Sequence, residues 1–346
     1  MPSSRIQWID FCRVWTAFFV IVRHTYAPYG SVVFLADLFN YRSLIFVFFF
    51  LSGFFSKDNL NPTLRGGYQW LDFRRFMQIL MMFAFWSLVG FVFLLPLNYP
   101  MVWQHGEVVW SNVVTALGIT WMFGWNVPLW FLRVLMVLAL FAPVLRRCSS
   151  GLLAVFIVGM MAAGEVFCEE AWDEGGNAPG WVPYRMYESL YAWAFFAGGI
   201  LVKREVGTDK LTEFVTRYSW LIILFAVALF VPVRLWGFLL PCRSGALVML
   251  GVGTIMSIGC LAQRFTPRLC NYVASWGPAA FFIYVTHDII LPYLKLLWLN
   301  FFEWNTAGAM VIPLITLCVC CCLFIFLRRI CPGFTRWAAM VKIQNK

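Results

Sequence analysis

The sequence predicts an all-α membrane protein, a bundle of about ten transmembrane helices. Two features of the composition indicate this class: 62% of the 346 residues are hydrophobic, including 18 Trp and 36 Phe, and only 12% are charged. A water-soluble core does not need so much apolar surface. The third observation is that the apolar residues form runs long enough to cross a bilayer. We see no internal repeat and no separate soluble segment, so we expect one membrane domain over residues 1–346.

Ten apolar runs account for the expected helices in chain order. They cover residues 8–28, 34–55, 76–95, 128–145, 151–167, 187–202, 219–236, 245–262, 275–294 and 308–327. The first run is too long and too charged to be the apolar part of a signal peptide, so we expect it to remain as the first span. A span at Glu107 to Gly124 would put Arg146 and Arg147 outside and reverse the charge bias of later loops. We therefore expect an outer amphipathic or re-entrant element there.

The positive charges predict the orientation of the helices. With a cytoplasmic N-terminus, 18 of the 26 Lys and Arg fall in inner segments and four in outer loops. This is the positive-inside bias, so we expect both termini in the cytoplasm. The net charge of +10 then reflects topology and attraction to anionic lipid headgroups, and we do not expect nucleic-acid binding.

The 11 cysteines and three histidines give little indication of a metal or redox site. Four cysteines lie in the last run, where a free thiol packs as a small apolar group. There is no pair of CxxC motifs, and the histidines are far apart without ligand spacing, so we expect no metal. Cys168 and Cys242 fall in predicted outer loops, and the sequence leaves open whether they form a disulfide.

The first apolar run carries Asp10, Arg13, Arg23 and His24 at membrane depth, where a charge costs several kcal/mol unless it serves a site. At about 100° per residue, the spacing brings Arg13 and His24 to within about 20° of one helix face, about 16 Å apart along the axis. Asp10 lies about 60° from Arg13 and can pair with it one turn below. A ligand that touches both Arg13 and His24 must therefore be long and thin.

Several segments, in a fixed order, resemble the acyltransferase-3 family of integral membrane O-acyltransferases. They are the WID start at Trp8 with Arg13, ten residues and His24, then FVFFFLSGFF from Phe46, DFRRFMQIL from Asp72, VPLWFLRVLMVLALFAPVL from Val127, FFAGGIL from Phe195 and FFIYVTHDIIL from Phe281. The resemblance implies transfer of an acyl group, usually acetyl, from cytoplasmic acyl-CoA, without a permanently bound cofactor. The acceptor would be a hydroxyl of a glycan, lipid-linked sugar or small molecule beyond a bacterial inner membrane.

The polar residues of the first run fit this chemistry. A neutral imidazole can take the proton of an acceptor hydroxyl, so His24 is the candidate base. Arginine is a natural partner for CoA phosphates, so Arg13 is expected to hold the donor, with Asp10 fixing its rotamer. The alternative is that Arg13 snorkels to the interface beside Asp10 and that His24 is a hydrogen-bonded core residue.

Other polar residues are weaker candidates. Arg74 and Arg75, in the basic turn after the second run, are expected to help bind the donor. Arg133 either lines the same cavity or pairs with Asp37 or Glu188. Ser52 is expected to be a small residue at the cavity or in the packing beside Gly53, because no GxSxG turn surrounds it. His287 and Asp288 either form a second polar cluster facing the pore, or His287 bonds a neighbouring helix.

Two other classes of protein share some of these features. A secondary transporter also buries charges in a bundle, but it would show paired repeats with helices broken at matching positions, and we find none. A second family of membrane O-acyltransferases carries its histidine late in the chain and would centre on His287. The pair of Arg13 and His24 in the first run argues against that family.

Overall fold

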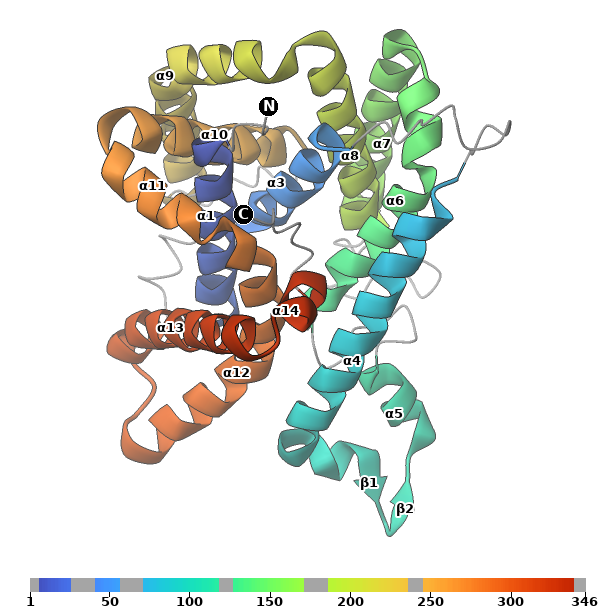
Figure 1. Ribbon diagram of the computed structural model, residues 1–346, viewed down its shortest axis with the longest axis vertical. Helices are drawn as coiled ribbons and strands as arrows, with labels where there is room; N and C mark the ends of the chain where they lie inside the picture. The colour runs from blue at the N-terminus through green and yellow to red at the C-terminus, as the bar shows by residue number, and fades with distance from the viewer. Residues whose placement is uncertain are drawn as a thin grey trace. The chain divides into compact units, whose positions relative to one another are not determined.

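The computed structural model describes residues 6–25, 41–56, 71–117, 127–170, 186–235 and 245–338. These residues are almost entirely helical (Figure 1). The elements are α1 (Gln7–Thr25), α3 (Tyr41–Phe54), α4 (Phe73–Val102), β1 (Trp103–Gln104), β2 (Glu107–Val108), α5 (Trp110–Ala116), η1 (Val127–Leu129), α6 (Trp130–Arg147), α7 (Ser150–Glu170), α8 (Met186–Glu205), α9 (Gly207–Leu235), α10 (Gly245–Phe265), α11 (Pro267–Ser275), η2 (Gly277–Ala279), α12 (Ala280–Phe301), α13 (Thr306–Ile330) and α14 (Pro332–Ala338).

The described part of each of the ten predicted apolar runs is helical, apart from a break in the ninth run. Six helical segments are long and apolar enough to cross a membrane: Phe73–Val102, Ser150–Phe167, Gly207–Leu229, Gly245–Phe265, Pro267–Phe301 and Thr306–Ile330. The apolar part of α3, Leu44–Phe54, is shorter. The all-α membrane class is thereby confirmed, whereas the count of ten spans and the sides of the termini stay predictions.

The ninth predicted run differs in detail from the structure. It was expected to be one helix over residues 275–294, but Ser275 ends α11 and a 3₁₀ turn, η2, precedes α12. Pro278 lies in this turn, and a proline cannot donate the backbone hydrogen bond that a continuous helix would need there. Helix α11, from Pro267, was not predicted, because its sequence is less apolar than that of the spans on either side.

The segment from Glu107 to Gly124 forms a hairpin strand and a short helix in its described part. Strands β1 and β2 pair antiparallel, with Trp103 opposite Val108, around a turn at His105 and Gly106. Both turn residues have positive φ, 52° at His105 and 83° at Gly106. Glycine adopts such an angle at no steric cost. Helix α5 has seven residues, about 10 Å, and is too short to span a bilayer. These two strands are the exception to the all-α prediction, and residues 118–124 lie outside the described part.

The chain divides into two compact units. Unit 1 comprises Met1–Leu44, Thr212–Cys242 and Leu247–Lys346, and unit 2 comprises Ile45–Leu211 and Arg243–Ala246. In unit 2, α4 packs against α6, and α8 packs against both α6 and α7. Glycines allow the close approach of α3 and α8, because a Cβ at Gly53 would overlap the backbone of Phe196. Ser52 is half-buried and precedes Gly53, the residue at which α3 approaches α8.

In unit 1, α1 packs against α11, α12 and α13, and α12 lies beside α13 (Figure 1). The indole of Trp8 on α1 donates to Thr212 Oγ1 at 3.2 Å, and Cys12 Sγ lies 3.3 Å from the carbonyl oxygen of Ile255 on α10. The latter contact is possible because residue 259 is a glycine, whose missing Cβ leaves room for Cys12. These contacts hold α1 in place by close packing, which is what associates helices in lipid.

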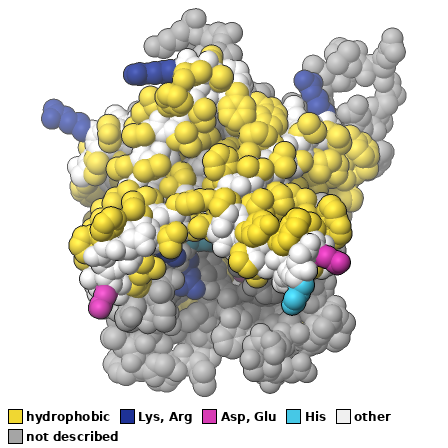
Figure 2. Space-filling model, turned by 90° about the horizontal axis from the view of Figure 1, so that it is seen from below, with side chains coloured by type: hydrophobic (Ala, Val, Ile, Leu, Met, Phe, Trp, Pro, Cys, Tyr) yellow, Lys and Arg dark blue, Asp and Glu magenta, His cyan; other side chains and the backbone are white. Residues whose placement is uncertain are grey.

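Large apolar side chains cover much of the described surface, and few charged side chains interrupt them on the face seen in Figure 2. Exposed examples on separate helices include Met81, Val155, Leu224, Leu297 and Phe326. A soluble protein rarely exposes contiguous apolar surface of this extent, whereas lipid tails accept it. The surface and the composition therefore indicate the same environment.

Candidate functional site

The N-terminal half of α1 carries an ion pair. Asp10, in the first turn, is buried with 5% of its surface exposed, and its Oδ1 accepts a hydrogen bond of 3.0 Å from Arg13 Nη1. The Arg13 side chain is 35% exposed. The pairing expected from the spacing of the two residues is thus present. It fixes the guanidinium on the face of α1 that also carries His24.

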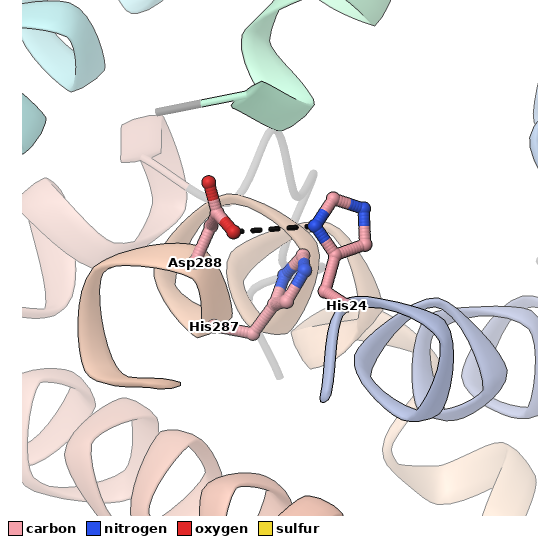
Figure 3. A group of neighbouring side chains, drawn as sticks. All are labelled: His24, His287 and Asp288. Carbon is pink, nitrogen blue, oxygen red and sulfur yellow. Dashed lines mark hydrogen bonds and ion pairs between the residues drawn. The ribbon is translucent and has the colours of Figure 1, made fainter. Parts of the chain in front are cut away.

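At the other end of α1, His24 meets a carboxylate from a different helix. Its Nδ1 lies 3.2 Å from Oδ1 of Asp288 on α12 (Figure 3). The two side chains are 25% and 13% exposed, so the imidazole is accessible while the carboxylate is nearly enclosed. In Figure 3 the second ring nitrogen of His24 lies on the side of the ring away from Asp288.

Lys295, two turns after Asp288 on α12, also reaches the end of α1. Its Nζ donates a hydrogen bond of 2.8 Å to the backbone carbonyl oxygen of His24. Because α1 ends at Thr25, this carbonyl has no helical N–H to accept from. A cation also suits the partial negative charge at a helix C-terminus. Lys295 therefore anchors the last turn of α1, and with it His24, to α12.

His287 forms the buried floor of the cluster. It is 0% exposed, and its ring lies edge-on to that of His24 with centroids 5.1 Å apart. Its Nδ1 lies 2.7 Å from the carbonyl oxygen of Tyr284. A carbonyl oxygen only accepts, so Nδ1 of His287 carries the hydrogen. Its Nε2 has no hydrogen-bond partner among the described residues. The structure thus places His287 and Asp288 in one cluster with His24, and His287 bonds its own helix.

The composition of this cluster also suits a transition metal. One ligand atom from each of His24, His287 and Asp288 lies within 4.8 Å of the others. The expectation of no metal site rested on the separation of the histidines along the chain, and the fold brings two of them together. However, the bond between His24 and Asp288 already satisfies two of the three ligand groups. That expectation therefore stays a prediction.

The remaining predicted residues belong to unit 2. Arg74 is exposed and Arg75 half-buried in the first turn of α4, where Asp72 Oδ1 accepts a 3.0 Å hydrogen bond from the backbone N–H of Arg75. Arg133 is half-buried on α6, which packs against α8, the helix of buried Glu188.

Three residues of the sequence predictions are not settled by this geometry. Asp37, Cys242 and the side chain of Cys168 lie outside what the structure describes. The pairing proposed for Arg133 with Asp37 and the disulfide between the cysteines therefore stay open.

Lys295 was missed as a site residue because it was assigned to an outer loop. One signal in the sequence points to it. Lys295 follows Asp288 by seven positions, which at about 100° per residue places both within about 20° of one helix face. A cation and an anion on one face of an apolar helix indicate a polar site.

The fold and the apolar surface define a multi-pass helical membrane protein with an ionisable cluster inside one unit. The family model described as an acyltransferase domain, Acyl_transf_3, matches residues 6–328, nearly the whole chain. The protein therefore belongs to the acyltransferase-3 family and is a membrane acyltransferase. No curated protein and no solved structure matches it.

Proposed function

We propose that the protein transfers an acyl group, acetyl in the first instance, from acyl-CoA to a hydroxyl of a glycan, a lipid-linked sugar or a small hydroxylated molecule. The observation that carries the proposal is the accessible imidazole of His24, which lies on the same face of α1 as Arg13 and is held by the carboxylate of Asp288 on α12. Membership of an acyltransferase family supplies the reaction class.

The chemistry requires one base that later acts as an acid. A neutral nitrogen of His24 takes the proton from the acceptor hydroxyl, and the oxygen attacks the thioester carbonyl carbon. The new C–O bond forms, the C–S bond breaks, and the CoA thiolate takes the proton back from the imidazolium. Ester and CoA thiol are the products, so atoms and charges balance. Histidine suits both steps because its ordinary pKa is near neutrality.

The donor is proposed to bind along α1. Arg13 would hold a phosphate or carbonyl oxygen of acyl-CoA through its planar fork, with Asp10 keeping the guanidinium in one orientation. The pantetheine arm is long and thin enough to extend the distance of about 16 Å from Arg13 to His24. The expectation that Arg74 and Arg75 help to bind the donor stays a prediction, and Arg74 is exposed in the first turn of α4.

Binding of radiolabelled acetyl-CoA to the purified protein in detergent tests this proposal and separates it from a solute transporter. Saturable binding that weakens in Arg13→Ala is expected. Arg264→Ala is the matched control, because Arg264 is an exposed arginine at the end of α10 in the same unit. Absence of saturable binding, or equal loss in both variants, would contradict the donor assignment.

The proposed orientation places Arg13 towards the cytoplasmic donor and both termini inside, in a bacterial inner membrane. It predicts that residues 57–75 face the cytoplasm. A cysteine introduced by Asn59→Cys in intact cells should resist an impermeant thiol reagent and react after the membrane is opened. Ready labelling from outside would reverse the topology, and a cysteine introduced by Trp110→Cys should show the opposite pattern.

A further inference from the structure

We infer that Asp288 is the positioning residue that sets the tautomer of His24, so that Nε2 of His24 is the base. The inference rests on the proposed acyltransferase function and names the atom at which its proton transfer occurs. It identifies one residue, 264 positions further along the chain, that selects this atom.

The first step concerns the hydrogen between the two groups. An ionised carboxylate has acceptor sites and no donor, so the 3.2 Å contact requires a hydrogen on Nδ1 of His24. A neutral imidazole carries one hydrogen, which leaves Nε2 with its lone pair. In Figure 3 this nitrogen lies on the side of the ring away from Asp288, where an incoming hydroxyl can meet it.

The second step concerns the charge state of Asp288. Lys295 lies two turns further along the same face of α12 and anchors the end of α1, so Asp288 has a cation on its own helix as well as the ring of His24 beside it. When His24 takes the proton, the imidazolium forms beside a carboxylate that is only 13% exposed. Opposite charges in such an enclosed place attract more strongly than in water. Asp288 thus orients the ring and stabilises the protonated intermediate.

The third step excludes the neighbouring His287 as the base. His287 also has its hydrogen on Nδ1, which faces the carbonyl of Tyr284. Its side chain is 0% exposed and its ring lies edge-on to that of His24, with centroids 5.1 Å apart, so an acceptor cannot reach its Nε2. His287 is therefore the buried floor of the cluster, and the histidine that an acceptor can reach is His24.

Nitrogen-15 NMR of detergent-solubilised protein with labelled histidine tests the tautomer directly, without an acceptor. The chain has three histidines, so three imidazole signals are expected, and His24→Ala assigns one of them. At a pH where the ring is neutral, His24 should show a hydrogen on Nδ1 and a bare Nε2. A hydrogen on Nε2 would overturn the inference while leaving acyl transfer by His24 possible.

Asp288→Asn supplies the activity test. The amide keeps the size of the side chain but can donate to Nδ1, so both tautomers should appear in the spectrum. Turnover should fall by about 10²- to 10⁴-fold, the range of a general base or its tautomer, with the dissociation constant of acetyl-CoA within about twofold. Asp288→Glu should recover at least about tenfold, because it restores the carboxylate.

Thr286→Val is the matched control. Thr286 is a buried polar residue of α12 two positions away; its Oγ1 contacts the carbonyl oxygen of Phe282 and Cys320 Sγ, both outside the cluster. It should leave turnover and tautomer unchanged. Equal losses in Thr286→Val and Asp288→Asn would mean that α12 is only sensitive to substitution, and the inference would be wrong. Absence of acetyl-CoA binding by the unchanged protein would instead contradict the proposed function.

Discussion

The two ends of α1 hold their charged side chains in different ways. Asp10 and Arg13 pair within one helix, three residues apart, whereas His24 pairs with Asp288, 264 residues away on α12. The first pair forms whenever the helix forms. The second exists only when α1 and α12 are packed. One end of α1 is therefore a local feature, for which we propose donor binding, and the other is a tertiary feature, for which we propose the role of base.

The largest effect is expected from removing the base. His24→Ala and His24→Gln should each lower acyl transfer by about 10²- to 10⁴-fold, because neither side chain takes a proton at neutral pH. Acetyl-CoA should still bind, since Arg13 lies about 16 Å away along the helix. Release of CoA thiol and equilibrium binding measure the two quantities. Equal loss of binding in His24→Gln would make His24 a structural or donor-binding residue.

Substitution of Arg13 tests the N-terminal end of α1, where the ion pair is local. Arg13→Ala should weaken acetyl-CoA binding by about 10- to 100-fold, the range expected for losing charge-assisted hydrogen bonds of about 1.5–3 kcal/mol. Arg13→Lys should recover little, because a single ammonium group lacks the planar fork. Titration of radiolabelled donor gives both constants. A lysine variant that binds and turns over acetyl-CoA like the unchanged protein would contradict a bidentate role.

A smaller effect is expected at the contact that joins the two helices. Lys295→Met removes the hydrogen bond to the carbonyl of His24, a contribution of about 0.5–1.5 kcal/mol, so turnover should fall by up to about tenfold. Lys295→Gln retains a donor and should lose less. Donor affinity serves as the internal control and should not change. Similar turnover in Lys295→Met and the unchanged protein would mean that α12 positions His24 without this bond.

The smallest effect is expected at Asp10. Asp10→Asn removes the charge that orients Arg13, and a partly exposed ion pair contributes about 0.2–1 kcal/mol, so acetyl-CoA binding should weaken by about two- to fivefold. The turnover of bound donor should be the same as in the unchanged protein. A larger loss than in Arg13→Ala would show that Asp10 does more than orient the arginine, for example by contacting the donor itself.

The sequence identified the residues of both ends apart from Lys295, but it explained only the end that carries Asp10 and Arg13. Helical periodicity placed Asp10, Arg13 and His24 on related faces because that geometry depends only on spacing along the chain. His287 and Asp288 were named as polar residues in a span, with their partners left open. Arg133 lies on its expected helix, whereas Arg74 and Arg75, expected in a turn, lie in the first turn of α4. The part of Arg74 and Arg75 in binding the donor, and that of Arg133 at the cavity, stay predictions.

By itself, the sequence determined the membrane class, most of the helices and the ion pair on α1, because composition and local spacing are sufficient for each. The tertiary structure decided which carboxylate meets His24, that Lys295 secures the end of α1 and that His287 is enclosed. These depend on how α1 packs on α12 across an intervening stretch of about 250 residues. Side-chain partners at that separation follow from packing of whole helices, which no local pattern in the chain specifies.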